Sequence, residues 1–125
     1  MNNEDQRDRI DQDVAHRRML SAVVGLAIRD ACAINGSRFR DDTRTAISFL
    51  FEHSDGYLEM LDIDPKQFRE RLLAAIFKNP GPSKRPITAG LTSVDLDRFA
   101  NNYRRWWREK SNVYLRNKDE HNEYH

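Results

Sequence analysis

The sequence predicts an all-α fold: a single compact domain of about five helices, with a helix-turn-helix-like corner at residues 57–72. Apolar residues recur at spacings of three and four, the period of an amphipathic helix, and no segment alternates as a half-buried strand does. Breaks rich in Gly, Pro, Asn and Asp separate the helical segments. A chain of 125 residues has room for one modest core. We therefore expect a helical domain over residues 14–115, between flexible tails at 1–13 and 116–125.

The first predicted helix covers about residues 14–34 and ends at Asn35-Gly36, a typical C-terminal stop. Its apolar positions form a wide stripe, which indicates a helix packed against a core. That stripe comprises Leu20, Val23, Val24, Leu26, Ala27, Ala31 and Ile34.

Asp30 falls inside this apolar stripe. A buried carboxylate without a partner is costly, so it must find a cation or a hydrogen-bond donor. Arg38, Arg40 and Arg44 follow closely in the sequence, and we expect a structural ion pair between Asp30 and Arg44. The alternative is that the carboxylate caps a neighbouring helix. A single aspartate with no second carboxylate or histidine nearby is a poor basis for a catalytic site.

Three further helices are expected before the proline-rich segment at 79–90. A helix at about 41–52 has two aspartates in its first turn, where they suit the positive end of the helix dipole. A short helix follows at about 56–61, and then a tight corner. Asp64 is a good N-cap and Pro65 a good first helical residue, so the next helix is expected to begin there and to end near Lys78.

The last long helix is expected to start after Thr92 or Ser93 and to reach at least Lys110. It contains FANNYRRWWREK, a basic and aromatic mixture typical of proteins that bind single-stranded nucleic acid. Helical geometry argues against that interpretation, because Trp107 falls on the apolar arc and Trp106 at its rim. The rings are therefore expected in the core and the guanidinium groups in water, where they suit phosphates. This basic face comprises Arg98, Arg105 and Arg108, with Arg104 beside it.

Charge is unevenly distributed along the chain. The net charge is +1, but residues 1–65 carry eight basic and thirteen acidic groups, net −5. Residues 66–110 carry eleven basic and four acidic groups, net +7, and residues 111–125 have net −1. A basic C-terminal half points to a surface that faces a polyanion, although solvated arginine-rich helix faces are also common.

Composition and motifs argue against several classes of protein. Cys32 is the only cysteine, so no internal disulfide can form, and its apolar surroundings predict a buried reduced thiol. No window approaches the ~18 apolar residues of a membrane span, and no apolar signal segment precedes the domain, so we expect a cytoplasmic protein. His121 and His125 are too few ligands for a zinc site. We expect no enzymatic activity, no cofactor and no bound metal.

The segment YLEMLDIDPKQFRERL, residues 57–72, has the pattern of a helix-turn-helix. Its spacing resembles the I-A-x-x-L-G-I-S-x-x-T-V-x-x-x-L pattern of bacterial and phage regulators. Such families prefer a small residue where this chain has Leu58 and Gly where it has Asp62, so a purely structural corner is the alternative. In a helix-turn-helix the second helix enters the major groove. The side chains presented there would be Lys66, Arg69 and Glu70.

A wider resemblance covers residues 23–72. The arrangement AIRDAC … TAISFLF … LDIDPKQFRERL looks like that of small helical proteins found in bacteriophages and prophages. Asp30 and Arg69 match positions of that group, and Asp64-Pro65 matches its helix start. The resemblance implies a phage accessory or regulatory protein in a bacterial host cell, and it assigns no activity.

These observations lead to two functional hypotheses. The first is a phage-type DNA-binding or regulatory protein, whose partner is double-stranded DNA contacted at the 57–72 corner. The basic side chains of the C-terminal half would add phosphate contacts; they are Lys84, Arg85, Arg98, Arg105 and Arg108. The alternative is a small helical interaction module that binds a host or phage protein without nucleic acid. The oligomeric state is not predicted.

Overall fold

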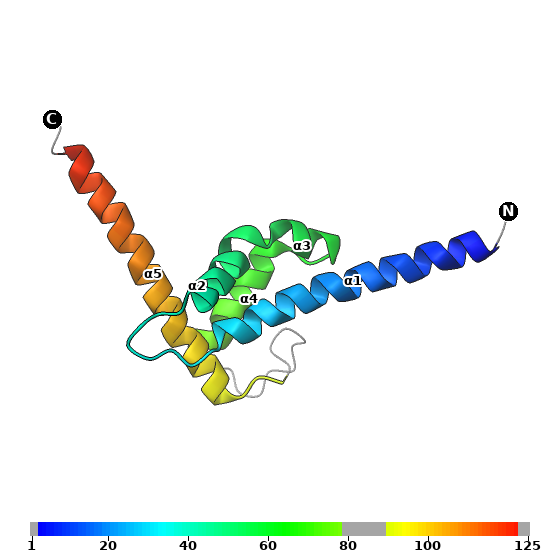
Figure 1. The fold of residues 1–125 in the computed structure, drawn as a ribbon, viewed down its shortest axis with the longest axis horizontal. Coiled ribbons are helices and arrows are strands. Elements are labelled where there is room, and N and C mark those ends of the chain that lie inside the picture. Colours follow the sequence, from blue (N-terminus) through cyan, green and yellow to red (C-terminus); the bar gives the residue numbers. More distant parts are fainter. Residues whose placement is uncertain (1–2, 79–89, 123–125) are drawn as a thin grey trace.

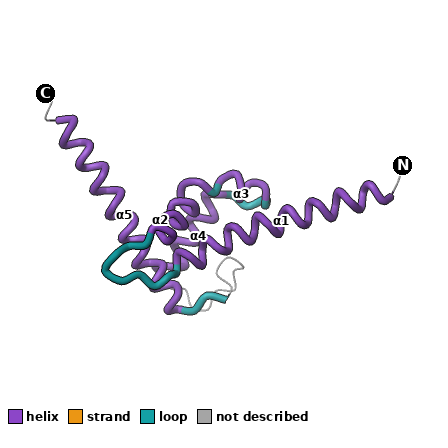
Figure 2. The backbone as a smooth tube through the Cα atoms, viewed as in Figure 1, coloured by secondary structure: helices purple, strands orange, loops and turns teal. Residues whose placement is uncertain are grey.

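The computed structural model describes residues 3–78 and 90–122, which form helices joined by short connections (Figures 1 and 2). No strand occurs among the described residues, so the predicted all-α class and single domain of five α-helices are confirmed. The elements in chain order are α1 (Asn3–Ala31), α2 (Asp41–Ser48), the π-helical turn η1 (Phe49–His53), α3 (Asp55–Met60), α4 (Pro65–Lys78) and α5 (Ser93–Asn122).

The two terminal helices are longer than the sequence indicated. α1 begins at Asn3 rather than near Val14, and α5 continues to Asn122. Most of the residues expected as tails are therefore helical. The N-terminal segment is rich in Glu, Asp, Gln and Arg, which include several good helix formers, and its acidic groups suit a helix N-terminus. Figure 1 shows the outer ends of α1 and α5 extending away from the body of the domain in different directions.

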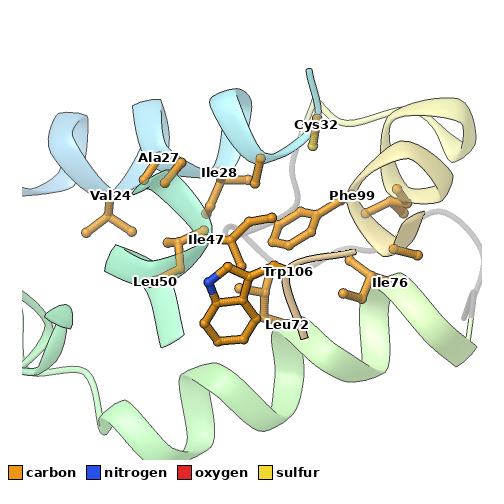
Figure 3. Close-up of a cluster of buried hydrophobic side chains, with 14 of the residues drawn as sticks. Val24, Ala27, Ile28, Cys32, Ile47, Leu50, Leu72, Ile76, Phe99 and Trp106 are labelled. Atoms are coloured by element: carbon orange, nitrogen blue, oxygen red, sulfur yellow. The ribbon is translucent and has the colours of Figure 1, made fainter. Parts of the chain in front are cut away.

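One apolar core joins all the helices. α1 and α2 pack against each other, α5 packs against α4 and α2, and the buried side chains between them form a single cluster (Figure 3). Phe68, Leu72 and Phe99 are fully buried at its centre, with Ile47, Leu50 and Leu58. Phe68 and Leu72 thus anchor α4 as their spacing of four predicts.

The buried face of α1 is narrower than its apolar stripe. Leu20, Val24, Ala27 and Ala31 are buried, but Val23 and Leu26 are exposed, Leu26 to 58%. The elements that contact α1, which are α2, η1, α3 and α5, leave part of its apolar stripe exposed. The remaining apolar side chains of α1 form a second, uncovered face.

The expected ion pair between Asp30 and Arg44 is wrong. The guanidinium of Arg44 instead binds both carboxylate oxygens of Glu109 on α5, with Nε–Oε2 at 2.8 Å, and contacts Asp41 at 2.5 Å. Asp30 is half-buried at the end of α1. Arg44 lies on the side of α2 that faces α5, where the carboxylate of Glu109 is within hydrogen-bond distance. The pKa of Glu109 is held below its ordinary value by this hydrogen bond.

Candidate nucleic-acid interface

The corner between α3 and α4 is closed by a Schellman motif. The N–H of Ile63 donates to the carbonyl of Leu58 at 2.8 Å, and the N–H of Asp62 donates to that of Glu59 at 3.0 Å. Asp62 has φ of +59°, and among the described residues it is the one non-glycine residue with positive φ. This is the position where helices usually place Gly. Asp62 therefore adopts the left-handed conformation at the cost of some strain.

The start of α4 is as the sequence predicts. Asp64 Oδ1 accepts a hydrogen bond from the backbone N–H of Lys66 at 2.9 Å, and Pro65 is the first helical residue. The carboxylate thus satisfies an N–H that the first turn of a helix leaves without a partner.

Arg69 does not face solvent as a groove-reading side chain would. Its Nε donates to the carbonyl of Leu50 at 3.3 Å, and its guanidinium also binds Asp55 and approaches Ser54. The hydroxyl of Ser54, fully buried, donates to the same Leu50 carbonyl at 2.8 Å. Arg69 therefore ties α4 to the junction of η1 and α3, and the predicted base contact is not available in this conformation.

Arg98 and Arg105 are also held by the backbone of the segment that follows α1. Arg98 Nε donates to the carbonyl of Cys32 at 3.1 Å. Arg105 donates to the carbonyls of Gly36 and Ser37 at 2.9 and 3.1 Å. These arginines donate to backbone carbonyls of a connection that has no regular hydrogen bonding. Part of their hydrogen-bonding capacity is therefore used inside the fold and is not free for a phosphate.

The other predicted contact residues fall into two groups. Lys66, Glu70 and Arg108 are exposed. Lys84 and Arg85 lie outside the described residues. The six of these predicted residues that the structure describes therefore do not gather into one surface: three are used inside the fold, and the three exposed ones lie on two helices.

The charge around the corner is acidic. Five exposed carboxylates outnumber the exposed basic groups Lys66, Arg71 and Arg17, the last of which pairs with Asp62. Duplex DNA presents dense negative charge, so such a surface repels it. The carboxylates are those of Asp55, Glu59, Asp62, Asp64 and Glu70.

Of the two α5 tryptophans expected in the core, Trp106 is buried there and Trp107 is not. Trp106 is 4% exposed, and its indole N–H donates to Ser48 Oγ at 2.8 Å, whereas Trp107 is 57% exposed. The core seam of α5 follows Leu96, Phe99 and Tyr103 to Trp106, and Figure 3 shows the Trp106 ring among the core side chains. Trp107 lies one position past this seam. Apolar spacing alone could not separate these neighbours, because each continues a three-or-four pattern.

The exposed Trp107 lies on one helix face with two arginines. Arg104, Trp107 and Arg108 are three and four residues apart, so their side chains project from the same side of α5. All three are exposed. The guanidinium of Arg104 stacks over the exposed ring of Phe77 on α4, 4.9 Å from its centroid. We call these four side chains the α4–α5 face.

Cys32 is buried, as predicted. Burial, with a smaller contribution from Asp95, raises the pKa of the thiol to about 12. A thiol in this state is a poor nucleophile at neutral pH.

Comparison with protein families, with curated proteins and with solved structures gives no match for this chain. The resemblance to phage proteins therefore stays a prediction. Within the described residues, no helix has the length and apolar character needed to cross a membrane.

Proposed function

We propose that this protein binds nucleic acid through the α4–α5 face. The observation that carries the proposal is the exposed indole of Trp107, which shares one face of α5 with Arg104 and Arg108. Proteins that bind single strands combine aromatic rings, on which bases stack, with cationic groups that contact the phosphates. Phe77, under the guanidinium of Arg104, provides a second ring beside the first arginine.

A strand with unpaired bases fits this face better than a duplex. In a duplex the bases already stack on each other, so Trp107 would find no free base surface. The arginine side chains act on either form, because guanidinium groups bind phosphate oxygens in a fork. The proposed binding region therefore still lies in the basic C-terminal half of the chain, but the nucleic acid contacts α5 and not the corner at 57–72.

Binding of duplex DNA at the corner between α3 and α4 is the alternative, and one experiment can test both modes of binding. The tight turn at Asp62 favours a helix-turn-helix geometry, but the carboxylates around it oppose DNA. Lys66 is the exposed basic side chain early on α4. Lys66→Glu is therefore the substitution that tests the corner, and Arg69→Glu is unsuitable because it also breaks bonds inside the fold.

The test is fluorescence anisotropy with a labelled single strand of ~20 nucleotides and the matching duplex. Trp107→Ala is expected to weaken single-strand binding about 5- to 150-fold, since stacking contributes ~1–3 kcal/mol per base. The logarithm of the binding constant falls linearly with the logarithm of the salt concentration. Removing both Arg104 and Arg108 should make this slope less negative by about 1.4 for the single strand. Val113→Ala and Arg18→Ala, exposed residues elsewhere, are the matched controls.

Three results would decide between the hypotheses. Undetectable binding of either probe at low salt, or equal affinity of wild type and Trp107→Ala for the single strand, contradicts the proposal. Tighter binding of the duplex that Lys66→Glu abolishes would instead favour the corner. Loss of affinity confined to the α4–α5 substitutions supports the proposal.

A protein-interaction module is the second candidate function, and α1 favours it. Met19 and Leu26 are more than half exposed on a helix whose other side is already buried. Continuous exposed apolar surface of this kind marks contact with another protein. Under this function, substitutions such as Leu26→Glu change association with protein and leave the affinity for oligonucleotides unchanged.

A further inference from the structure

A hollow lies where the C-terminal end of α1 meets the start of α5 (Figure 1). Its volume is about 900 Å³, and it is lined by residues of α1, of the segment that follows α1 and of the first turns of α5. Pockets that bind small molecules have volumes of about 300–1,000 Å³ and combine apolar walls with a few polar groups. The hollow therefore has the size of a ligand site. We call it the α1–α5 hollow.

The walls of this hollow are mostly apolar. Leu26 on α1 and Leu91 before α5 contribute hydrocarbon surface, and the small residues Ala22 and Gly25 leave space beside them. Gly25 lies inside a long helix, where glycine is less favourable than alanine. A Cβ at this position would meet no other segment or side chain within 4 Å, so the packing of the described chain does not require glycine here. Its effect is to keep the hollow open next to the backbone of α1.

The lining also carries a positive charge that the fold does not neutralise. Arg98 Nη2 donates to the carboxylate of Asp95 at 2.7 Å, so this carboxylate of the lining is paired with one of its two guanidinium groups. The other guanidinium is that of Arg29, which is exposed and has no salt bridge within residues 3–78 and 90–122. Asp30, its neighbour in the sequence, is half-buried and does not line the hollow. The described lining therefore has one positive charge in excess.

We propose that the α1–α5 hollow binds a small organic anion with an apolar body, of the class of medium-chain carboxylates. The carboxylate accepts hydrogen bonds from Arg29, because a planar guanidinium binds both oxygens of a carboxylate in a fork. The hydrocarbon chain lies between Leu26 and Leu91 and covers the backbone at Gly25. One molecule thereby neutralises the excess charge and removes apolar surface from water.

Both parts of the ligand follow from the lining. An inorganic anion would leave Leu26 and Leu91 in contact with water, and a neutral hydrocarbon would leave Arg29 without a counter-charge. An amphipathic cation would bring a like charge to Arg29, which is unfavourable. This inference goes beyond the proposed contact with nucleic acid, because the described lining includes no residue of the α4–α5 face.

The test is a titration of the isotope-labelled full chain with sodium octanoate, followed through the amide resonances in NMR spectra. The shifts should be largest for amides that line the hollow, such as those of Gly25, Arg29 and Leu91, with a Kd of about 1 mM or below for a ligand of this size. Acetate, which lacks the apolar chain, and octylammonium, which has the opposite charge, should each bind at least about tenfold more weakly. Octylammonium that binds as tightly as octanoate, or no shift of any amide at ~10 mM octanoate, would overturn the proposal.

Two pairs of variants assign the binding to the hollow. Gly25→Glu places a carboxylate four residues before Arg29, where the two side chains pair on one helix face, and it should weaken octanoate binding at least about tenfold because this carboxylate takes the place of the ligand. Gly56→Glu puts the same charge at a helical glycine of α3 with equal space around it and should leave the affinity unchanged. Arg29→Gln should weaken octanoate binding about tenfold, and Arg18→Gln, an exposed arginine of the same helix, is its control. If Gly25→Glu and Arg29→Gln both bind octanoate as wild type does, the ligand binds elsewhere and the proposal is wrong.

Discussion

The side-chain amide of Asn102 donates hydrogen bonds to the carbonyl oxygens of Ala31 and Ala33, both at 2.9 Å. Asn102 is 4% exposed, on the core side of α5, and its Oδ1 faces the amide of Asn35 at 3.3 Å. The last carbonyls of a helix have no partner within that helix. One buried side chain of α5 therefore closes the C-terminus of α1 and fixes the two helices to each other.

Replacing Asn102 should destabilise the domain. Asn102→Ala leaves buried carbonyl groups without donors, and we expect a loss of about 2–3 kcal/mol in the free energy of unfolding. Asn102→Asp should cost at least as much, because it directs a carboxylate at two carbonyl oxygens. Urea denaturation measures both, with the exposed neighbour Asn101→Ala as the control. Similar midpoints for Asn102→Ala and Asn101→Ala would contradict this assignment.

Neighbouring tryptophans should respond differently to truncation. Trp106→Ala removes a core ring and the donor to Ser48, so we expect a loss of about 3–5 kcal/mol. Trp107→Ala removes a ring that is mostly in water, and it should change stability by no more than about 0.5 kcal/mol. The same urea experiment distinguishes them. A larger loss for Trp107→Ala than for Trp106→Ala would mean that their burial is reversed.

Local signals made the starts of α4 and α5 predictable from sequence. Asp64 caps α4 through its own carboxylate, and Thr92 precedes α5 as expected. A cap is decided within four residues, so its chemistry is visible in the sequence. The choice between Trp106 and Trp107 is decided by where α4 and η1 meet α5, and no local pattern contains that information.

The structural roles of three arginines could not be predicted from the sequence either. Arg69, Arg98 and Arg105 were predicted to face nucleic acid because they are basic and lie on helix faces away from the apolar stripe. Each instead donates to a carbonyl of a distant segment. One signal was present: the loop after α1 and the turn at η1 expose carbonyl groups that need donors. The sequence does not show which arginine lies within reach of them.

The left-handed conformation of Asp62 predicts a stabilising substitution. Gly adopts positive φ without the steric cost that a side chain meets. Asp62→Gly should therefore raise the free energy of unfolding by about 0.5–1 kcal/mol, even though it removes an exposed ion pair with Arg17. Asp62→Ala, which loses the ion pair and keeps a Cβ, is the control and should not stabilise. Thermal unfolding that shows no gain for the glycine variant would contradict the assigned backbone geometry.

The start of α5 predicts a specific response to acid. The hydroxyl of Thr92 accepts from the N–H of Asp95 at 3.1 Å, and the carboxylate of Asp95 accepts from the N–H of Thr92 at 3.0 Å, which is a capping box. The backbone hydrogen bond from Thr92, followed by that from Arg98, lowers the pKa of Asp95.

Because the folded state has the lower pKa, Asp95 stabilises the fold above the unfolded value of about 3.9, and this contribution is lost as the pH falls through the folded pKa. Asp95→Asn should therefore have a lower Tm than wild type at pH 7, and the difference in Tm should shrink as the pH falls below the unfolded pKa and through the lower folded pKa. Asp97→Asn, an exposed aspartate in the same turn, should follow wild type at every pH. A gap between wild type and Asp95→Asn that stays constant down to pH 2 would show that the ionised carboxylate is not the stabilising group.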